Sequence, residues 1–145
     1  MISFDAYEID FTLSHEFETS NWIEHIIHSH GMVIHQLSFI FCSDAYLLKL
    51  NRQYLSHDYY TDILTFPYHE DPSKGLWSDI YISIARIKEN AESFQKPFEE
   101  ELHRVIIHGV LHLLGYDDHG ENESLMREKE DWALKRRVWL DEKET

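Results

Sequence analysis

Apolar and polar residues alternate in some segments of the chain, and in others apolar residues recur every three or four positions. Alternation predicts strands, because successive side chains of a strand point to opposite faces of the sheet. Apolar residues three and four positions apart predict helices with one buried face. Strands are expected at 9–13, 37–41, 63–66 and 79–84, where the alternation is clearest.

The expected helices carry recognisable end signals. Thr19-Ser20 caps the first, which Gly31 ends, and Ser43-Asp44 caps the second. Pro97 opens a later helix that runs to Gly115, and its first turn holds three glutamates that suit the helix dipole. Two more helices are expected at 84–94 and 122–140. The expected inward residues are Trp22, Ile23, Ile26 and Ile27, then Tyr46, Leu47 and Leu50, and finally Leu125, Trp132 and Trp139.

This order of elements predicts an α+β fold: a mixed sheet of about four strands, with helices packed mainly on one face. The 145 residues contain no repeat or linker, so we expect a single domain over 1–145. The first residues lack the basic and apolar regions of a signal peptide, and no stretch is long enough to span a membrane. A cytoplasmic protein is expected, and the one cysteine, Cys42, lies in an apolar run where a buried, inert thiol is expected.

The formal net charge is −14, which argues against a protein that coats nucleic acid without specificity. A local basic groove is still compatible with that charge. Lys135-Arg136-Arg137 is interpreted as a solvated group that balances the dipole at the end of the last helix. The cations expected to line a groove are Lys49, Arg52, Arg86, Lys88 and Arg104.

The segment from 102 to 114 is apolar on nearly every side of its expected helix, and only one stripe interrupts it. Arg104, His108 and His112 are each four residues apart and therefore share a face. Imidazoles on a buried helix need partners for their ring nitrogens. A divalent metal is one such partner. The alternative is a pair of histidines that are hydrogen-bonded in a core without a metal.

A third ligand is available just after this helix. Gly115 lets the chain leave the helix through a left-handed conformation and turn back over the same face. That turn brings Asp117, Asp118 or His119 toward His108 and His112. Three protein ligands with an open position are typical of a catalytic zinc site, and a single cysteine excludes a cysteine-rich structural one.

The spacing invites comparison with the zinc peptidase motif H-E-x-x-H, in which the glutamate is the general base. Gly109 occupies the position of that glutamate here. A peptidase of this class would lack its base, so the sequence disfavours one.

HGVLHLLGYDDH, at 108–119, resembles the signature H-G-x-L-H-L-x-G-Y-D-H of the YbeY family. NRQYLSHDYYTDILTFP at 51–67 is similar to the family's N-x-x-Y-R-x-x-D-x-P-T-D-V-L-S-F-P, and SDIYIS at 78–83 is similar to its G-D-I-x-I-S strand. The resemblance covers about 35–135. It implies a single-domain, metal-dependent endoribonuclease that acts in ribosomal RNA maturation and ribosome quality control.

Three residues depart from the family pattern. Asp118 stands where the family has its third histidine, with His119 one position later, so the expected metal ligands are His108, His112 and Asp118, with His119 as the alternative. Leu55 replaces an arginine that the family is thought to use toward RNA. Tyr60 replaces a proline of the motif.

From the resemblance we expect a single-strand-specific endoribonuclease that holds one Zn²⁺ per chain, or another divalent ion, and acts in 16S ribosomal RNA maturation. Because leucine cannot contact the developing charge, His57 and Arg52 are the candidate catalytic residues. Expected partners are ribosomal RNA and the small ribosomal subunit with its proteins, and neither DNA nor a membrane. The alternatives are a non-catalytic ribosome-assembly factor that a metal stabilises and a peptidase-like hydrolase.

Overall fold

A computed structural model describes residues 1–139 of the chain. Four strands form one sheet in the order β1-β2-β4-β3, in which β1, β2 and β4 are parallel and β3 is antiparallel to β4. The α+β fold and the mixed four-stranded sheet are therefore confirmed. The elements are β1 Ile2–Ala6, α1 Glu16–Ser29, β2 Ile34–Cys42, α2 Asp44–Leu55, β3 Ile63–Pro67, a short 3-10 helix Pro72–Lys74, β4 Leu76–Ser83, α3 Ile84–Phe94, α4 Phe98–Leu113 and α5 Asn122–Leu134.

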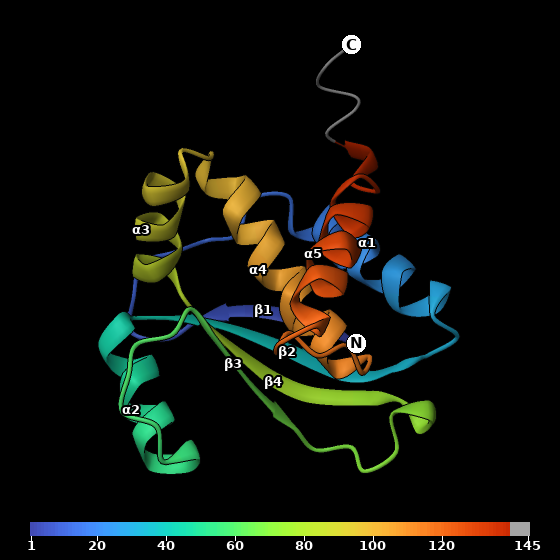
Figure 1. Ribbon diagram of the computed structural model, residues 1–145, viewed down its shortest axis with the longest axis horizontal. Helices are drawn as coiled ribbons and strands as arrows, with labels where there is room; N and C mark the ends of the chain where they lie inside the picture. The colour runs from blue at the N-terminus through green and yellow to red at the C-terminus, as the bar shows by residue number, and fades with distance from the viewer. Residues whose placement is uncertain (140–145) are drawn as a thin grey trace.

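The helices α1, α3, α4 and α5 lie on one face of the sheet, and α2 lies on the other (Figure 1). The alternation of β4 explains the two layers. Ile80 and Ile82 point into the main core, whereas Tyr81 packs with Leu47 and Leu64 under α2. The expectation that the helices cover mainly one face is confirmed, and α2 is the exception.

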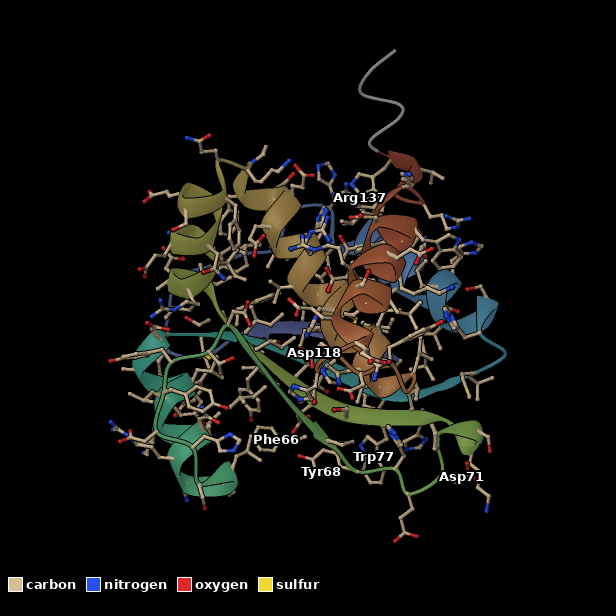
Figure 2. The ribbon with its side chains drawn as sticks, viewed as in Figure 1. Phe66, Tyr68, Asp71, Trp77, Asp118 and Arg137 are labelled. Atoms are coloured by element: carbon tan, nitrogen blue, oxygen red, sulfur yellow. The ribbon has the colours of Figure 1, made fainter. Side chains whose placement is uncertain are left out.

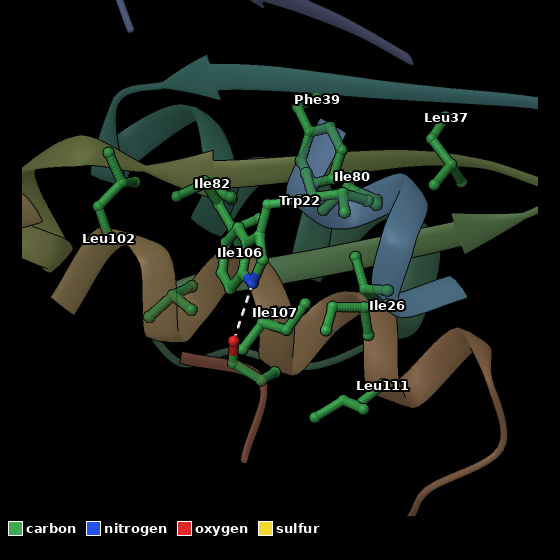
Figure 3. Close-up of a cluster of buried hydrophobic side chains, with 14 of the residues drawn as sticks. Trp22, Ile26, Leu37, Phe39, Ile80, Ile82, Leu102, Ile106, Ile107 and Leu111 are labelled. Carbon is green, nitrogen blue, oxygen red and sulfur yellow. Dashed lines mark hydrogen bonds between the residues drawn. The ribbon is translucent and has the colours of Figure 1, made fainter. Parts of the chain in front are cut away.

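The main core joins α1 and α4 to the sheet (Figure 3). Trp22, Ile26 and Ile106 are at most 3% exposed, and the indole Nε1 of Trp22 donates a hydrogen bond to the carbonyl of Ala133, 2.8 Å away. This bond ties the first helix of the chain to the end of α5. A buried indole N–H needs such a partner, so the contact also fixes where α5 ends against the core.

Gly109 sets how closely α4 approaches the sheet. A Cβ atom at this position would lie 2.6 Å from Cδ1 of Ile63 and 3.7 Å from methyl carbons of Thr65 and Ile80. The glycine is therefore a close-packing residue between α4 and the strands β3 and β4. Any larger side chain at this position, a glutamate included, would have to displace the end of the Ile63 side chain.

The expected strand at 9–13 is wrong, because the first strand is β1, Ile2–Ala6. Ile2 and Phe4 of β1 pair in register with Leu37 and Phe39 of β2. The segment 9–13 still buries Leu13, but it crosses the end of the core without pairing to a strand. Alternation of apolar residues indicates that one side of an extended segment is buried. It does not show whether that segment pairs with a neighbouring strand.

Helix ends also differ from the pattern. The helix α1 begins at Glu16, and Thr19 is buried inside it with its hydroxyl bonded to the carbonyl of His15 at 2.7 Å, so Thr19 is no cap. In α5 the side chain of Leu125 is 44% exposed, which corrects its expected inward position. That helix ends at Leu134, where the expectation ran to 140, and residue 140 lies outside the described residues.

Ser43 caps α2 as the sequence predicts, and Ser83, for which no cap was predicted, caps α3. The hydroxyl of Ser43 accepts a hydrogen bond from the backbone N–H of Tyr46, and that of Ser83 accepts from Arg86. The cap at Ser83 ends β4 there, so Ile84 belongs to α3 and not to the expected strand at 79–84.

Cys42 is fully buried, as expected, and burial raises the pKa of its thiol to about 12. The reactive thiolate is therefore disfavoured at this position. Among residues 1–139, none of the helices combines the length and apolar character needed to cross a membrane.

The contact of Gly109 with Ile63 predicts a coupled pair of substitutions. In the parent chain Gly109→Ala forces the Ile63 side chain to move, and this cost opposes the gain in helix propensity. Ile63→Val removes Cδ1 and alone costs roughly 0.5–1.5 kcal/mol. Denaturant unfolding of the four variants is expected to give Gly109→Ala a smaller cost in the Ile63→Val background, by about 1 kcal/mol. Strict additivity of the two substitutions would contradict this packing.

Candidate metal centre

His108 and His112 lie on the same face of α4, with ring centroids 5.2 Å apart. The carboxylate of Asp118 faces both rings. Its Oδ2 is 3.2 Å from Nε2 of His108, and its Oδ1 is 3.3 Å from Nε2 of His112. Figure 2 shows Asp118 beneath the end of α4, above the strands β3 and β4. The structure thus brings together three residues that the sequence spaces over eleven positions.

The turn after α4 delivers Asp118 to this place. Gly115 adopts a φ of +107°, a conformation that residues with a side chain rarely adopt, and the N–H of Tyr116 returns to the carbonyl of Leu111 at 3.0 Å. The hydroxyl of Tyr116 then lies 3.0 Å from Nε2 of His30, the residue that follows the last turn of α1. The turn that the sequence predicts at Gly115 is therefore present, and a contact with α1 holds it.

The three residues fit a divalent ion. The ligand atoms of His108, His112 and Asp118 all lie within 4.8 Å of one another. Neighbouring ligands of a tetrahedral zinc ion, with bonds near ~2.0–2.1 Å, are about 3.3 Å apart, which is close to both nitrogen-to-oxygen distances. Two imidazoles and one carboxylate are also a donor set that zinc accepts.

His119 occupies a different position from Asp118. Its side chain is 86% exposed, and its Nε2 lies 3.6 Å from Oδ1 of Asp118 and 3.9 Å from Oδ1 of Asp117. Asp117 accepts a hydrogen bond from the backbone N–H of His119, which stiffens the turn. This geometry favours Asp118 over His119 as the third ligand, and the assignment stays a prediction.

Glu130 on α5 supports the cluster from behind. Its Oε2 lies 2.7 Å from Nδ1 of His108, and its Oε1 accepts a 2.7 Å hydrogen bond from Arg104. Arg104 also pairs with Asp131 at 2.6 Å. A carboxylate on Nδ1 holds the proton there and leaves Nε2 free to face Asp118. The local pattern of α5 does not reveal this role of Glu130, because nothing in it marks the residue as a partner of His108, 22 positions away.

The charges of this group shift two pKa values in opposite directions. Burial alone would lower the pKa of His108 and raise that of Glu130. The hydrogen bond and the charge attraction between them outweigh burial, so the pKa of His108 is raised above 6.5 and that of Glu130 is lowered below 4.5. At acidic pH, protons therefore compete with a metal ion for His108.

A cleft of about 500 Å³ opens beside the cluster, with His108 and Asp118 in its wall. Asp62, just before β3, and Glu101 on α4 also line it. Burial is the main cause that raises the pKa of both carboxyls, and the charge of Asp62 adds to the rise at Glu101. The structure thus adds two acidic groups to this region that sequence analysis did not single out.

The structure places the candidate catalytic residues elsewhere. Arg52 pairs with Asp58, and Nδ1 of His57 lies 3.0 Å from the hydroxyl of Tyr59. Both belong to α2 and the loop after it, on the sheet face opposite α4, and neither lines the cleft. Leu55, at the end of α2, is 39% exposed. The structure does not bring these residues to the histidines, and a catalytic role for His57 and Arg52 stays a prediction.

The basic groove stays a prediction, and the arginines expected to line it are paired with carboxylates of the chain. Arg86 bonds Asp44 at 2.7 Å, and Arg104 bonds Glu130 and Asp131. Of the five cations expected in the groove, Arg104 alone lines the cleft.

The cations after α5 balance its helix end as expected, but the expected solvated group is wrong for Arg137, because burial lowers its pKa and its guanidinium lies 2.8 Å from Nδ1 of His103. Arg136 donates to the carbonyl of Trp132 at 2.7 Å, and Arg137, labelled in Figure 2, donates to that of Leu134 at 2.8 Å. These bonds satisfy carbonyl groups that lack partners within the helix.

The position of Glu130 predicts an effect on metal affinity. Glu130→Gln removes the negative charge that orients His108 and makes it more basic, and loss of such a partner typically costs about 10–100-fold in affinity. Zinc titration with a competing chelator measures this loss. Asp131→Asn is the matched control, because Asp131 shares Arg104 but touches neither histidine, and its affinity is expected to match the parent. Equal losses of zinc affinity in both variants would show that the affinity depends on the pairing of Arg104 and not on the bond between Glu130 and His108.

Comparison with known proteins identifies the family of the chain. The family model described as Endoribonuclease YbeY matches residues 5–137. Endoribonuclease YbeY of Flavobacterium psychrophilum is 50% identical over 93% of this chain and 95% of its own, and that of Christiangramia forsetii is 51% identical over 86% of each. The solution structure of TM1509 from Thermotoga maritima superposes with a TM-score of 0.66 at 30% identity, over 99% of this chain and 93% of its own. The chain therefore belongs to the YbeY family of endoribonucleases.

Proposed function

We propose that this protein is a zinc-dependent endoribonuclease that cuts single-stranded RNA in ribosomal RNA processing, including 16S maturation and ribosome quality control. One observation carries the proposal: the carboxylate of Asp118 faces Nε2 of both His108 and His112 at 3.2 and 3.3 Å. Membership of the family supports the activity on RNA. The same membership and the acidic net charge support a ribosomal partner, because a chain of charge −14 gains little affinity from phosphate alone.

His108, His112 and Asp118 would hold the ion, one per chain. When bound, a divalent ion supplies an acidic water near neutral pH and a positive charge that polarises a phosphoryl oxygen. The carboxylate ligand makes the site less positive than three histidines would, so the water is expected to be less acidic than in an all-histidine site.

Residues around the site orient the ring of His108. Glu130 holds the Nδ1 proton of His108, and Arg104 holds Glu130 through a second hydrogen bond. Gly109 offers no base. His119, exposed and 3.6 Å from Asp118, is the group beside the cluster that can accept a proton as RNA reacts.

A second candidate function is a ribosome-assembly factor without catalytic activity. Leu55 in place of an arginine, and the position of Arg52 and His57 on the opposite face from α4, favour it. For such a factor the metal would stabilise the turn at Gly115 and would have no role in turnover.

Metal content tests the assignment of ligands. Protein purified without chelators is expected to contain about one metal ion per chain. Asp118→Ala is expected to lose that metal, and His119→Ala is expected to keep it, because the His119 side chain points into solvent. Elemental analysis of the three proteins measures it. Loss of the metal in His119→Ala alone would show that His119, and not Asp118, is the third ligand. A parent protein without metal would contradict the assignment of a metal site.

Cleavage of RNA separates the two candidate functions. Zinc-loaded parent is expected to cut single-stranded ribosomal RNA fragments and to leave peptides intact. His112→Ala is expected to lose cleavage but to retain its fold, since the His112 side chain is 38% exposed and carries little of the core. Gel analysis of RNA products and thermal unfolding measure the two effects. An unfolded His112→Ala, with a parent that cuts no RNA, would favour the assembly factor.

A further inference from the structure

The cleft beside the candidate metal centre extends well past the histidines. Its wall includes the end of α3, the middle of α4 and the first turns of α5. Its volume of about 500 Å³ is within the range of pockets that hold small organic ligands. The candidate ligands His108 and Asp118 form only part of this wall, so the rest of the cleft is available to whatever is attached to the reacting group.

Buried apolar and acidic side chains both line the cleft, and Glu130, already bonded to Arg104 and His108, is one of its two buried acids. Val105 is 5% exposed, Met126 is 2% exposed and Glu101 is 6% exposed. The charge of Asp62 repels the carboxylate of Glu101 and raises its pKa further, whereas Arg104, Arg127 and a hydrogen bond with Asn90 partly oppose that rise. A carboxylate has room for several hydrogen bonds, and donors from a ligand relieve such repulsion.

The rim of the cleft is aromatic and basic. The side chain of Phe94 is 60% exposed at the end of α3, although large apolar side chains are usually buried. Lys96 and Arg127 are exposed on the same rim, and among residues 1–139 neither forms a salt bridge. These two cations therefore differ from Arg86 and Arg104, whose charges are held by internal carboxylates.

A nucleoside matches the volume of the cleft, its buried carboxyl and its aromatic and basic rim better than a bare phosphate group does. Carboxyls outnumber cations around the cleft, which repels an isolated phosphate. A nucleobase presents a flat apolar face that stacks on an aromatic ring, and cytosine, adenine and guanine carry amino groups that donate to carboxylates. With a base in the cleft, Lys96 and Arg127 on the rim would lie beside the phosphates that connect this nucleoside to its neighbours in the strand.

We propose that this cleft is the subsite for the nucleoside next to the bond that is cut, and that it selects a base with an exocyclic amino group. Phe94 stacks on the base, and Glu101 accepts a hydrogen bond from the amino group. Lys96 and Arg127 contact the flanking phosphates. The inference rests on the proposed ribonuclease function, and it adds the substrate preference of that site.

Steady-state cleavage of short single-stranded oligo(C) and oligo(U) by the zinc-loaded chain tests the stacking contact. Both substrates are pyrimidines, and they differ at the group that Glu101 would contact. Phe94→Ala is expected to raise KM about 5- to 100-fold for oligo(C) with little change in kcat, the range found for loss of one base–aromatic stack. Phe17→Ala is the matched control, because Phe17 is 74% exposed on α1 and lies outside the cleft.

The same assay tests base selection. The parent is expected to cut oligo(C) in preference to oligo(U), and Glu101→Gln is expected to narrow the ratio of their kcat/KM values about tenfold, since the amide also donates to uracil. Glu99→Gln is the matched control, because Glu99 lies two residues before Glu101 on α4 and outside the cleft. This variant is expected to keep the parent's ratio of kcat/KM values. Thermal unfolding of each variant establishes that the chain is folded.

The outcomes separate this inference from the proposed function. A parent that cuts neither RNA contradicts the proposed function. A parent that cuts RNA, with Phe94→Ala and Phe17→Ala indistinguishable in KM, overturns the stacking contact. An unchanged preference in folded Glu101→Gln overturns the selection of amino-bearing bases.

Discussion

The carboxylate of Glu130 is the group on which the arrangement of the site depends. It is 6% exposed, and a buried charge of this kind is stable only with partners on its oxygens. Arg104 and His108 provide them at 2.7 Å each, both from α4. One ion-pair network therefore docks α5 on α4 and also fixes the ring of His108. Packing of two helices and preparation of a metal ligand are, in this protein, the same interaction.

The close contact at Gly109 provides the second constraint. With no side chain at this position, α4 lies against Ile63 and Thr65 of β3 and Ile80 of β4. His108 precedes this contact directly and His112 follows it by less than one turn. The position of the cluster over the antiparallel edge of the sheet is thus set by backbone packing. A general base at position 109 would have to displace the end of the Ile63 side chain, which packs under α4.

The charge of the molecule determines how it can recognise RNA. Arginines that the sequence offers as a binding groove are held by Asp44, Glu130 and Asp131, so their charge stabilises the fold. Such a surface neutralises few phosphates, and affinity has to come from stacking, from base edges or from a partner. An acidic cleft with an exposed aromatic rim is consistent with the first two.

The sequence by itself determined the class of fold, three of the four strands, the capped start of α2, and the stripe of His108 and His112, because these follow from local periodicity and end signals. It also narrowed the third ligand to the turn after Gly115. The tertiary structure decided the first strand, the exposure of Leu125, the separation of His57 from the histidines, and the role of Glu130. These features depend on which distant segments pair and on which buried charges meet. Local sequence patterns cannot predict such contacts, because the contacts form only when α5 and the sheet pack against α4.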